Sequence, residues 1–139
     1  MTPIQWTESV VGKPWVDRAD GPDSFDCWGL VVDSFMRMEG VELNQVVGYA
    51  DGEPIEQAGP IEVSSGQWDQ IDSPQHGAVF CCYTAGGALQ HVGRVLHLAG
   101  AGLYCIHARG SNNKGQVAAD PIRLIERAYH QVTYYMRAV

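Results

Sequence analysis

The sequence has no run of basic residues: 9 lysines and arginines stand against 16 acidic residues, for a formal net charge of −7. Binding to nucleic acid or to an anionic membrane surface requires clustered Lys and Arg, so neither partner is expected. No apolar stretch is long enough to cross a bilayer, and residues 1–15 lack the basic and apolar regions of a signal peptide. We therefore expect a protein that folds in the cytosol, or that leaves it by a route needing no such signal.

The sequence also lacks the cysteine patterns of a structural framework. Of the four cysteines, Cys81 and Cys82 are adjacent, which argues against disulfides, as does the missing secretory signal. No CxxC motif occurs, so a zinc ribbon is not expected. A metal site of Cys27, His91 and His107 is a weaker interpretation, because their spacings are long and irregular. We predict no metal, and nothing in the sequence indicates a cofactor.

Apolar residues are abundant enough for one core. Hydrophobic residues make up 45% of the 139 residues and charged residues 18%, which predicts a single globular domain over residues 1–139. Helices are expected first and strands after them, so the predicted class is α+β. The expected elements are helices over 3–11 and 26–39, a short helix near Pro60, strands over 77–84, 88–98 and 103–108, a helix capped by Asp120, and a last strand over 130–139.

Cys27 lies at the expected start of the second helix, in the stretch SFDCWGLV. A free cysteine is usually a small buried hydrophobe, so core packing is one interpretation. The unpaired N–H groups of a helix N-terminus would instead lower the thiol pKa and could bind the oxyanion formed on an attacked carbonyl. Gly29 would let a substrate backbone come close, and Trp28 would shape one wall of the site.

A thiol nucleophile usually needs a base, and two histidines lie in successive predicted strands. If these strands pair as a hairpin, the side chains of His91 and His107 can lie on one face. One imidazole would accept the Cys27 proton and the other would hold the first in the right tautomer. Taken alone, either histidine is more often a hydrogen-bonded structural residue. Structural roles are predicted for the remaining histidines and cysteines: His76, His97, His130, Cys81, Cys82 and Cys105.

Four stretches stand in order between residues 10 and 108: KPWVDRADGPDSFDCWGLV, HGAVFCC, QHVGRVL and YCIHA. Together they resemble the NlpC/P60 cysteine peptidases, and most closely the short members associated with phage tails, in which Trp often follows the cysteine. The resemblance implies a papain-like core, in which the helix carrying the cysteine packs on an antiparallel sheet carrying the histidines. It assigns Cys27 as nucleophile, His91 as general base and His107 as the orienting third residue.

Other positions near the cysteine are compared with the family in the same way. Asp26 matches the family's acidic residue before the cysteine, and helix capping explains it equally well. Trp15 stands near an upstream aromatic residue, often Tyr, and either packs in the core or edges the cleft with its indole N–H. Trp28 replaces a small residue, often Ser, which affects substrate choice more than mechanism.

The resemblance also implies a function, a partner and a location. It implies a cysteine endopeptidase that hydrolyses peptidoglycan stem peptides, of the γ-D-glutamyl–diamino acid type, and needs no cofactor. Such a protein would be made in the bacterial cytoplasm, bind tail-tip or hub proteins of a phage-like tail, and act in the periplasm or cell wall. Two alternatives stay open: a structural tail-tip or tail-assembly protein with little or no activity, and acyl transfer or amide hydrolysis on another substrate.

Overall fold

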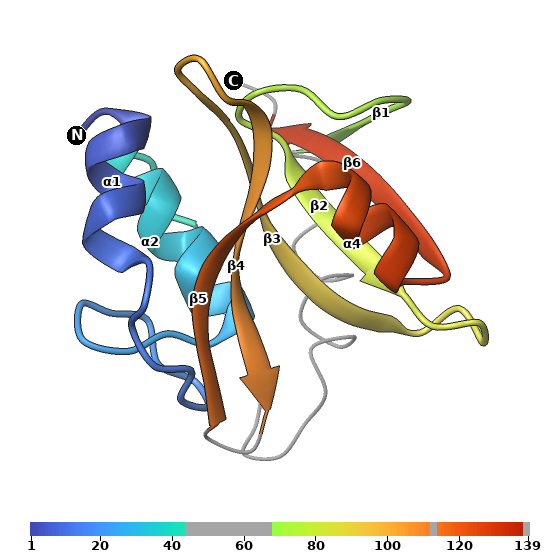
Figure 1. The fold of residues 1–139 in the computed structure, drawn as a ribbon, viewed down its shortest axis with the longest axis horizontal. Helices are drawn as coiled ribbons and strands as arrows, with labels where there is room; N and C mark the ends of the chain where they lie inside the picture. Colours follow the sequence, from blue (N-terminus) through green and yellow to red (C-terminus); the bar gives the residue numbers. More distant parts are fainter. Residues whose placement is uncertain (44–67, 112–113, 138–139) are drawn as a thin grey trace.

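The structure is a computed structural model that describes residues 1–43, 68–111 and 114–137. Over these residues it has three helices and one six-stranded sheet (Figure 1), which confirms the α+β class. The helices are α1 (Pro3–Val10), α2 (Cys27–Glu39) and α4 (Ile122–Ala128). The strands are β1 (Trp68–Ile71), β2 (Val79–Tyr83), β3 (Leu89–Leu98), β4 (Gly102–Ser111), β5 (Lys114–Pro121) and β6 (Gln131–Arg137).

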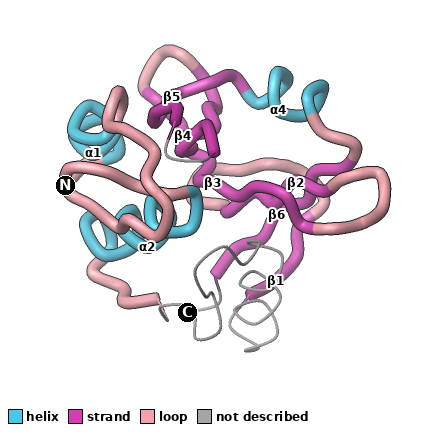
Figure 2. Tube along the Cα trace, turned by 90° about the horizontal axis from the view of Figure 1, so that it is seen from below, coloured by secondary structure: helices cyan, strands magenta, loops and turns pink. Residues whose placement is uncertain are grey.

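The sheet is the central layer and is antiparallel throughout, with the strand order β1-β6-β2-β3-β4-β5. Helices α1 and α2 lie on one side of it and α4 on the other, as Figures 1 and 2 show. Strand alternation divides the core in the same way. Leu96 of β3 packs in the cluster of α1 and α2, whereas its neighbour Val95 packs in the cluster that contains Ile125 of α4.

The first two helices begin at short-range sequence signals. Thr2 and Gln5 form a capping box at α1: the Thr2 hydroxyl accepts from the Gln5 N–H at 3.1 Å, and the Gln5 side chain accepts from the Thr2 N–H at 3.0 Å. Helix α2 begins at Cys27 with Asp26 as its N-cap, and it ends at Gly40 in the left-handed conformation, with φ of 68°. Both helices therefore lie where the sequence predicts them.

Strands β3 and β4 separate beside the start of α2. Strand β3 pairs with β2 between Leu89 and Arg94, but it pairs with β4 only from Arg94 onward. In the stretch of β3 that does not pair with β4, the backbone N–H of Val92 is close enough to the Cys27 thiol to favour its charged form. The fold therefore places the first residue of α2 next to the residue that follows His91.

The C-terminal part differs from the sequence prediction. Strands β1 and β5 were not predicted; β5 has few β-branched or aromatic residues, and it forms by pairing with β4 along its length. Asp120 belongs to β5, and α4 begins at Ile122 with Pro121 as N-cap and no side-chain cap. The prediction that Asp120 caps this helix is therefore wrong. The helix expected near Pro60 lies outside the described residues.

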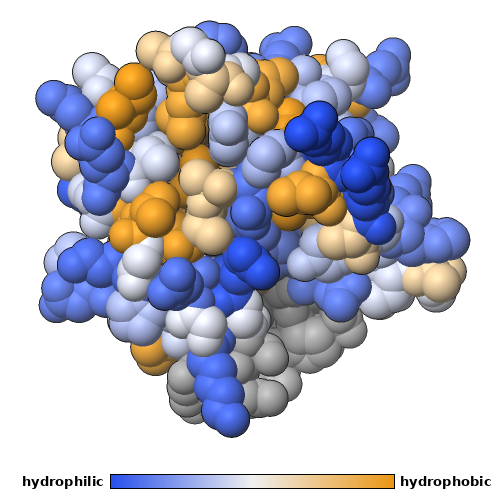
Figure 3. Space-filling model, in the orientation of Figure 1, coloured by the Kyte–Doolittle hydropathy of each residue, from blue (hydrophilic) through white to orange (hydrophobic). Residues whose placement is uncertain are grey.

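The apolar residues of the protein form neither a membrane-spanning helix among those described nor one continuous patch on the face drawn in Figure 3. Among the described helices, none is both long and apolar enough to cross a membrane. On the face drawn in Figure 3, apolar side chains form separate patches among hydrophilic ones, and several of the most hydrophilic side chains lie over α4.

Candidate active site

Cys27 is the first residue of α2, and only 7% of it is exposed. Three backbone N–H groups, those of Cys27, Trp28 and Val92, act on the thiol and favour its charged form. Two of these donors belong to the first turn of the helix, where N–H groups have no intrahelical partner. Donors of this kind can also stabilise an oxyanion that forms beside the sulfur.

The resting thiol is nevertheless a weak acid. Burial and, after it, the negative charge of Asp26 raise the pKa of Cys27 from 9.0 to about 12, although the three N–H groups lower it. The N–H groups at the helix N-terminus lower the thiol pKa, as expected, but desolvation outweighs their effect. At neutral pH the thiol of the free protein is protonated, so attack on a substrate requires a base.

His91 and His107 meet across strands β3 and β4, as the hairpin prediction required. The Nε2 atom of His91 lies 2.8 Å from the Nδ1 atom of His107. Burial, together with the charges of His107 and Arg109, lowers the pKa of His91 to about 3. Burial also lowers the pKa of His107, against the raising effect of Asp120. Both imidazoles are therefore neutral at pH 7.

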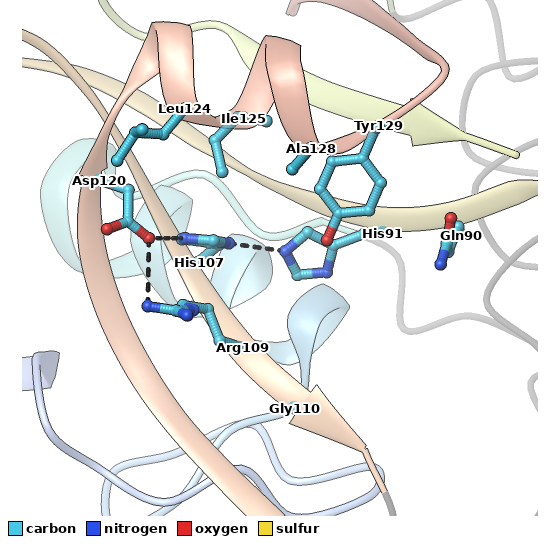
Figure 4. A pocket seen from close by; sticks show the side chains of 10 residues that line it. All are labelled: Gln90, His91, His107, Arg109, Gly110, Asp120, Leu124, Ile125, Ala128 and Tyr129. Atoms are coloured by element: carbon cyan, nitrogen blue, oxygen red, sulfur yellow. Dashed lines mark hydrogen bonds and ion pairs between the residues drawn. The ribbon is translucent and has the colours of Figure 1, made fainter.

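Asp120 joins this pair, and the sequence analysis missed it. Its Oδ2 atom lies 2.7 Å from the Nε2 atom of His107, and the Nη1 atom of Arg109 lies 3.6 Å from the same oxygen (Figure 4). The register pairs Asp120 with Cys105, so the Asp120 side chain is a diagonal neighbour of His107 on the same face. Only a predicted pairing of β5 with β4 could have revealed this contact.

A cavity of about 580 Å³ opens on the α4 side of the histidines (Figure 4). Tyr129 lines it and stacks on His91, with ring centroids 5.8 Å apart and ring planes at 16°. Cys27 does not line the cavity, so a ligand there meets the histidines and Tyr129 first. The lining residues are Gln90, His91, His107, Arg109, Gly110, Asp120, Leu124, Ile125, Ala128 and Tyr129.

Asp26 and Gly29 hold the start of α2 against the preceding loop. Asp26 is 1% exposed, and its carboxylate accepts from the N–H of Gly29 at 2.6 Å and from the N–H of Arg18 at 3.0 Å. A Cβ at Gly29 would lie 2.1 Å from the carbonyl oxygen of Ala19. The close backbone approach expected at Gly29 is therefore made by the loop of this chain. For Asp26, the structure confirms the capping role.

Trp15 and Trp28 both pack in the interior. Trp15 is partly buried against the cluster that contains Trp6, and its backbone N–H donates to the Gly115 carbonyl at 3.0 Å. Trp28 is 5% exposed and packs in the cluster that contains Leu89. Among the described residues, the indole N–H of Trp28 has no hydrogen-bond partner. Neither tryptophan lines the cavity, and their contacts with a substrate stay predictions.

The other three cysteines lie in the core, and one histidine outside the site forms a hydrogen bond with the backbone. Cys81, Cys82 and Cys105 are buried and free, as predicted. His76 accepts a hydrogen bond from the backbone N–H of His97 at 2.8 Å. Within the described ranges, no group of three His, Cys, Asp or Glu side chains could hold a metal ion.

A helix that begins with a cysteine packs here on an antiparallel sheet that carries a buried pair of histidines. The sequence model of the NlpC/P60 family matches residues 12–135. The chain therefore belongs to the NlpC/P60 family. Among curated proteins, none matches the chain.

Solved structures share this fold at low sequence identity. The NlpC/p60 domain of the peptidoglycan hydrolase SagA has a TM-score of 0.59 and 14% identity, over 96% of this chain and 93% of that one. NlpC1 from Trichomonas vaginalis has a TM-score of 0.61 and 19% identity, over 96% of this chain and 41% of that one. An N-acetylmuramoyl-L-alanine amidase from Bacteroides uniformis ATCC 8492 has a TM-score of 0.57 and 14% identity, over 97% of both chains.

Proposed function

We propose that the chain is a cysteine endopeptidase that hydrolyses amide bonds of peptidoglycan stem peptides, between γ-D-glutamate and a diamino acid. Cys27 is the nucleophile, His91 the general base and His107 the residue that orients His91. The observation that carries the proposal is the position of Cys27 at the start of α2, where the backbone N–H of Val92, the residue next to His91, acts on its thiol and favours the charged form. The second histidine then lies 2.8 Å behind the first.

The first chemical step transfers a proton and forms a carbon–sulfur bond. The Cys27 sulfur attacks the amide carbonyl carbon while its proton passes to the free ring nitrogen of His91. The carbonyl π electrons move onto oxygen, and the backbone N–H groups at the start of α2 stabilise this oxyanion. Because Cys27 has a raised pKa and His91 a lowered one, the neutral pair is favoured before attack. The proton therefore moves during attack, and no standing thiolate–imidazolium pair is required.

The second step releases both products. The oxyanion re-forms its carbonyl, the carbon–nitrogen bond breaks, and the imidazolium of His91 gives its proton to the departing amine. Water then attacks the thioester with His91 as base. The carbon–sulfur bond breaks, the acyl group leaves as a carboxylic acid, and the sulfur recovers a proton. The protein ends the cycle unchanged.

The test is cleavage of purified muropeptides of known stem sequence, followed by mass spectrometry. The wild type should release a fragment with a new amino group on the diamino acid, and Cys27→Ala should release none. Cys105→Ala is the matched control and should keep the activity, because Cys105 is another buried free cysteine and does not line the cavity. Cleavage that persists in Cys27→Ala would show that Cys27 is not the nucleophile.

A structural role with little activity is the second candidate. The exposed fractions of Cys27 and His91 are only 7% and 8%, and Tyr129 stacks on the imidazole of His91. A site this closed supports a protein that keeps the fold with little activity, and the sequence resemblance makes tail-tip or tail assembly the corresponding role. Wild-type protein that cleaves no muropeptide, while Cys27→Ala still assembles into working particles, would favour this function.

The same digestion also identifies the bond. One structural neighbour is an N-acetylmuramoyl-L-alanine amidase, so cleavage between the sugar and the first amino acid is the related alternative. The product masses of the two reactions differ, because the amidase reaction releases the whole stem peptide. A released stem peptide would replace the endopeptidase proposal with amide hydrolysis at the sugar.

The proposed setting is a phage or phage-like tail, with tail-tip or hub proteins as partners and the bacterial cell wall as the place of action. The sequence resemblance around DCWGLV supports this setting. Immunodetection of the chain in purified tails from an induced culture would test it. Chain found only in the soluble fraction of the lysate would contradict it.

A further inference from the structure

Three side chains on three neighbouring strands form one continuous line of contacts. The Nε2 atom of His91 on β3 lies 2.8 Å from Nδ1 of His107 on β4, and Nε2 of His107 lies 2.7 Å from Oδ2 of Asp120 on β5. Figure 4 shows the three side chains in a row along the wall of the cavity. Each imidazole therefore uses a defined nitrogen for each contact.

The number of protons on each group decides which group donates and which accepts in the two hydrogen bonds of this row. An ionised carboxylate only accepts hydrogen bonds, so His107 donates to Asp120 through a proton on Nε2. A neutral imidazole carries a single N–H, so Nδ1 of His107 is left as an acceptor. His91 must then donate to it through a proton on its own Nε2. The remaining nitrogen of His91, Nδ1, carries a lone pair and can accept a proton.

We propose that Asp120 is a positioning residue that fixes the tautomers of both His107 and His91, and thereby makes Nδ1 of His91 the base. The consequence for catalysis rests on the proposed function, because it requires that His91 accepts the Cys27 proton. The opposite direction would require a protonated Asp120 that donates to His107, and it would leave the only proton of His91 on Nδ1. In that state His91 could not deprotonate the thiol.

Asp120 would differ from a structural carboxylate because it decides which histidine donates to the other. Two neutral imidazoles do not by themselves decide which one donates, because either ring can donate to the other. A group that can only accept, placed beside one of the two histidines, decides which histidine donates. Asp120 is such a group, because it contacts Nε2 of His107, the nitrogen that faces away from His91. Arg109 contacts the same oxygen at 3.6 Å, and its side chain is 61% exposed. Arg109 therefore provides a control for the loss of charge beside Asp120.

The first experiment reads the tautomers directly, without substrate. Two-bond ¹H–¹⁵N correlation spectra of histidine-labelled protein at pH 7 distinguish a proton on Nδ1 from one on Nε2. His91→Gln and His107→Gln provide the assignments. We expect both histidines of the wild type to carry the proton on Nε2. A wild-type His91 with its proton on Nδ1 would overturn the proposal.

Variants test whether Asp120 sets the direction. In Asp120→Ala the acceptor is gone, and in Asp120→Asn the side chain can accept or donate, so both should show His91 protonated partly on Nδ1. Arg109→Gln and Glu126→Gln should keep the wild-type tautomers, because neither removes the bond from His107. Glu126 is a matched acid-to-amide control on α4, where it accepts from the Tyr134 hydroxyl at 3.0 Å. An unchanged tautomer of His91 in both Asp120 variants would refute the role of Asp120.

The kinetic readout separates positioning from folding. We expect Asp120→Asn to lower kcat by about 10- to 100-fold with KM changed by less than about twofold, as part of the ~10²–10⁴-fold effect of acid–base catalysis. An unchanged kcat would overturn the catalytic part of the proposal. If the tautomers behave as expected while Cys27→Ala still cleaves muropeptides, the proposed function fails and the proton arrangement stands.

Discussion

The carboxylate of Asp26 accepts a 2.6 Å hydrogen bond from the backbone N–H of Gly29 and so places a negative charge one residue before Cys27. This contact caps α2 and at the same time opposes ionisation of the thiol, since the Asp26 charge raises the pKa of Cys27. The residue that starts the helix therefore also weakens the acidity that a helix N-terminus gives to a cysteine. Capping and thiol acidity can be separated by substitution.

Asp26→Asn should keep the cap and lower the pKa of Cys27. Asn caps helices about as well as Asp, and it removes the charge that stands second to burial among the causes of the raised pKa. The pKa is measured from the alkylation rate of Cys27 against pH, followed by peptide mass spectrometry. Asp26→Ala is the control and should cost about 1 kcal/mol of unfolding free energy through the lost cap. An unshifted Cys27 profile in Asp26→Asn would contradict this electrostatic role.

Gly29→Ala should destabilise the protein although it lies inside a helix. Alanine favours a helix over glycine by about 1 kcal/mol, but its Cβ would stand 2.1 Å from the Ala19 carbonyl oxygen. Overpacking against backbone costs about 1–3 kcal/mol or more, so a net loss is expected. Urea unfolding measures it. Gly86→Ala, whose nearest atom would be 3.8 Å away, is the control and should change stability by less than about 0.5 kcal/mol. Equal stability of the two variants would show that the loop carrying Ala19 moves to make room for the added Cβ.

The acid limb of cleavage should lie well below the ordinary histidine range. His91 must be neutral to accept a proton, and its pKa is lowered to about 3. The kcat/KM value should therefore stay constant down to about pH 5 and fall as the pH drops through the pKa. Circular dichroism at each pH checks that the protein is still folded. A limb between pH 6 and 7 would show that His91 titrates as an ordinary imidazole.

Arg109→Gln should move that acid limb to higher pH. The positive charge of Arg109 lowers the pKa of both His91 and His107, so its removal lets both values rise. The same kcat/KM profile measures the shift, with Arg123→Gln as a control, because Arg123 does not line the cavity. A limb that stays in place in Arg109→Gln would mean that burial alone sets the pKa of His91.

Glu39→Ala should be costly because it leaves Arg94 as a buried, uncompensated cation. Arg94 is 1% exposed; its guanidinium donates to Glu39 and, at 3.0 Å each, to Ser34 and to the Gly77 carbonyl. We expect a loss of about 2–3 kcal/mol in urea unfolding, at the low end for buried pairs, because Glu39 itself is partly exposed.

The control for Glu39 is another ion pair on α2. Arg37 lies 3.4 Å from Asp33, four residues away, with 30% of its side chain exposed. Arg37→Ala should cost about 0.5 kcal/mol or less. Similar losses in Glu39→Ala and Arg37→Ala would show that solvent already screens Arg94.

The elements near the nucleophile could be predicted because their signals are local. Thr2 with Gln5, Asp26 before Cys27, and Gly40 after the last turn each act within three or four residues. Alternating apolar residues likewise placed the strands around His91 and His107. Strand β5 has no such pattern, since its order comes from pairing with β4 and not from its own side chains.

The histidine pair could be predicted for the same reason, whereas its third partner could not. Two strands that follow each other in the chain usually pair as a hairpin, and this pairing brings His91 and His107 together. Asp120 sits in a DP sequence that reads equally well as a helix start, and only the strand register places it beside His107. The stacking of Tyr129 on His91 likewise depends on where α4 packs.

By itself, the sequence determined α1, α2 and the strands around the two histidines, the placement of Cys27 at the start of a helix, and the family resemblance, because each depends on neighbouring residues. The tertiary structure alone decided that Asp120 and Arg109 join the histidines and that the Cys27 thiol is a weak acid. Such contacts depend on strand register across the sheet. The pKa depends on desolvation, which arises only when the helices close over the sheet and exclude water.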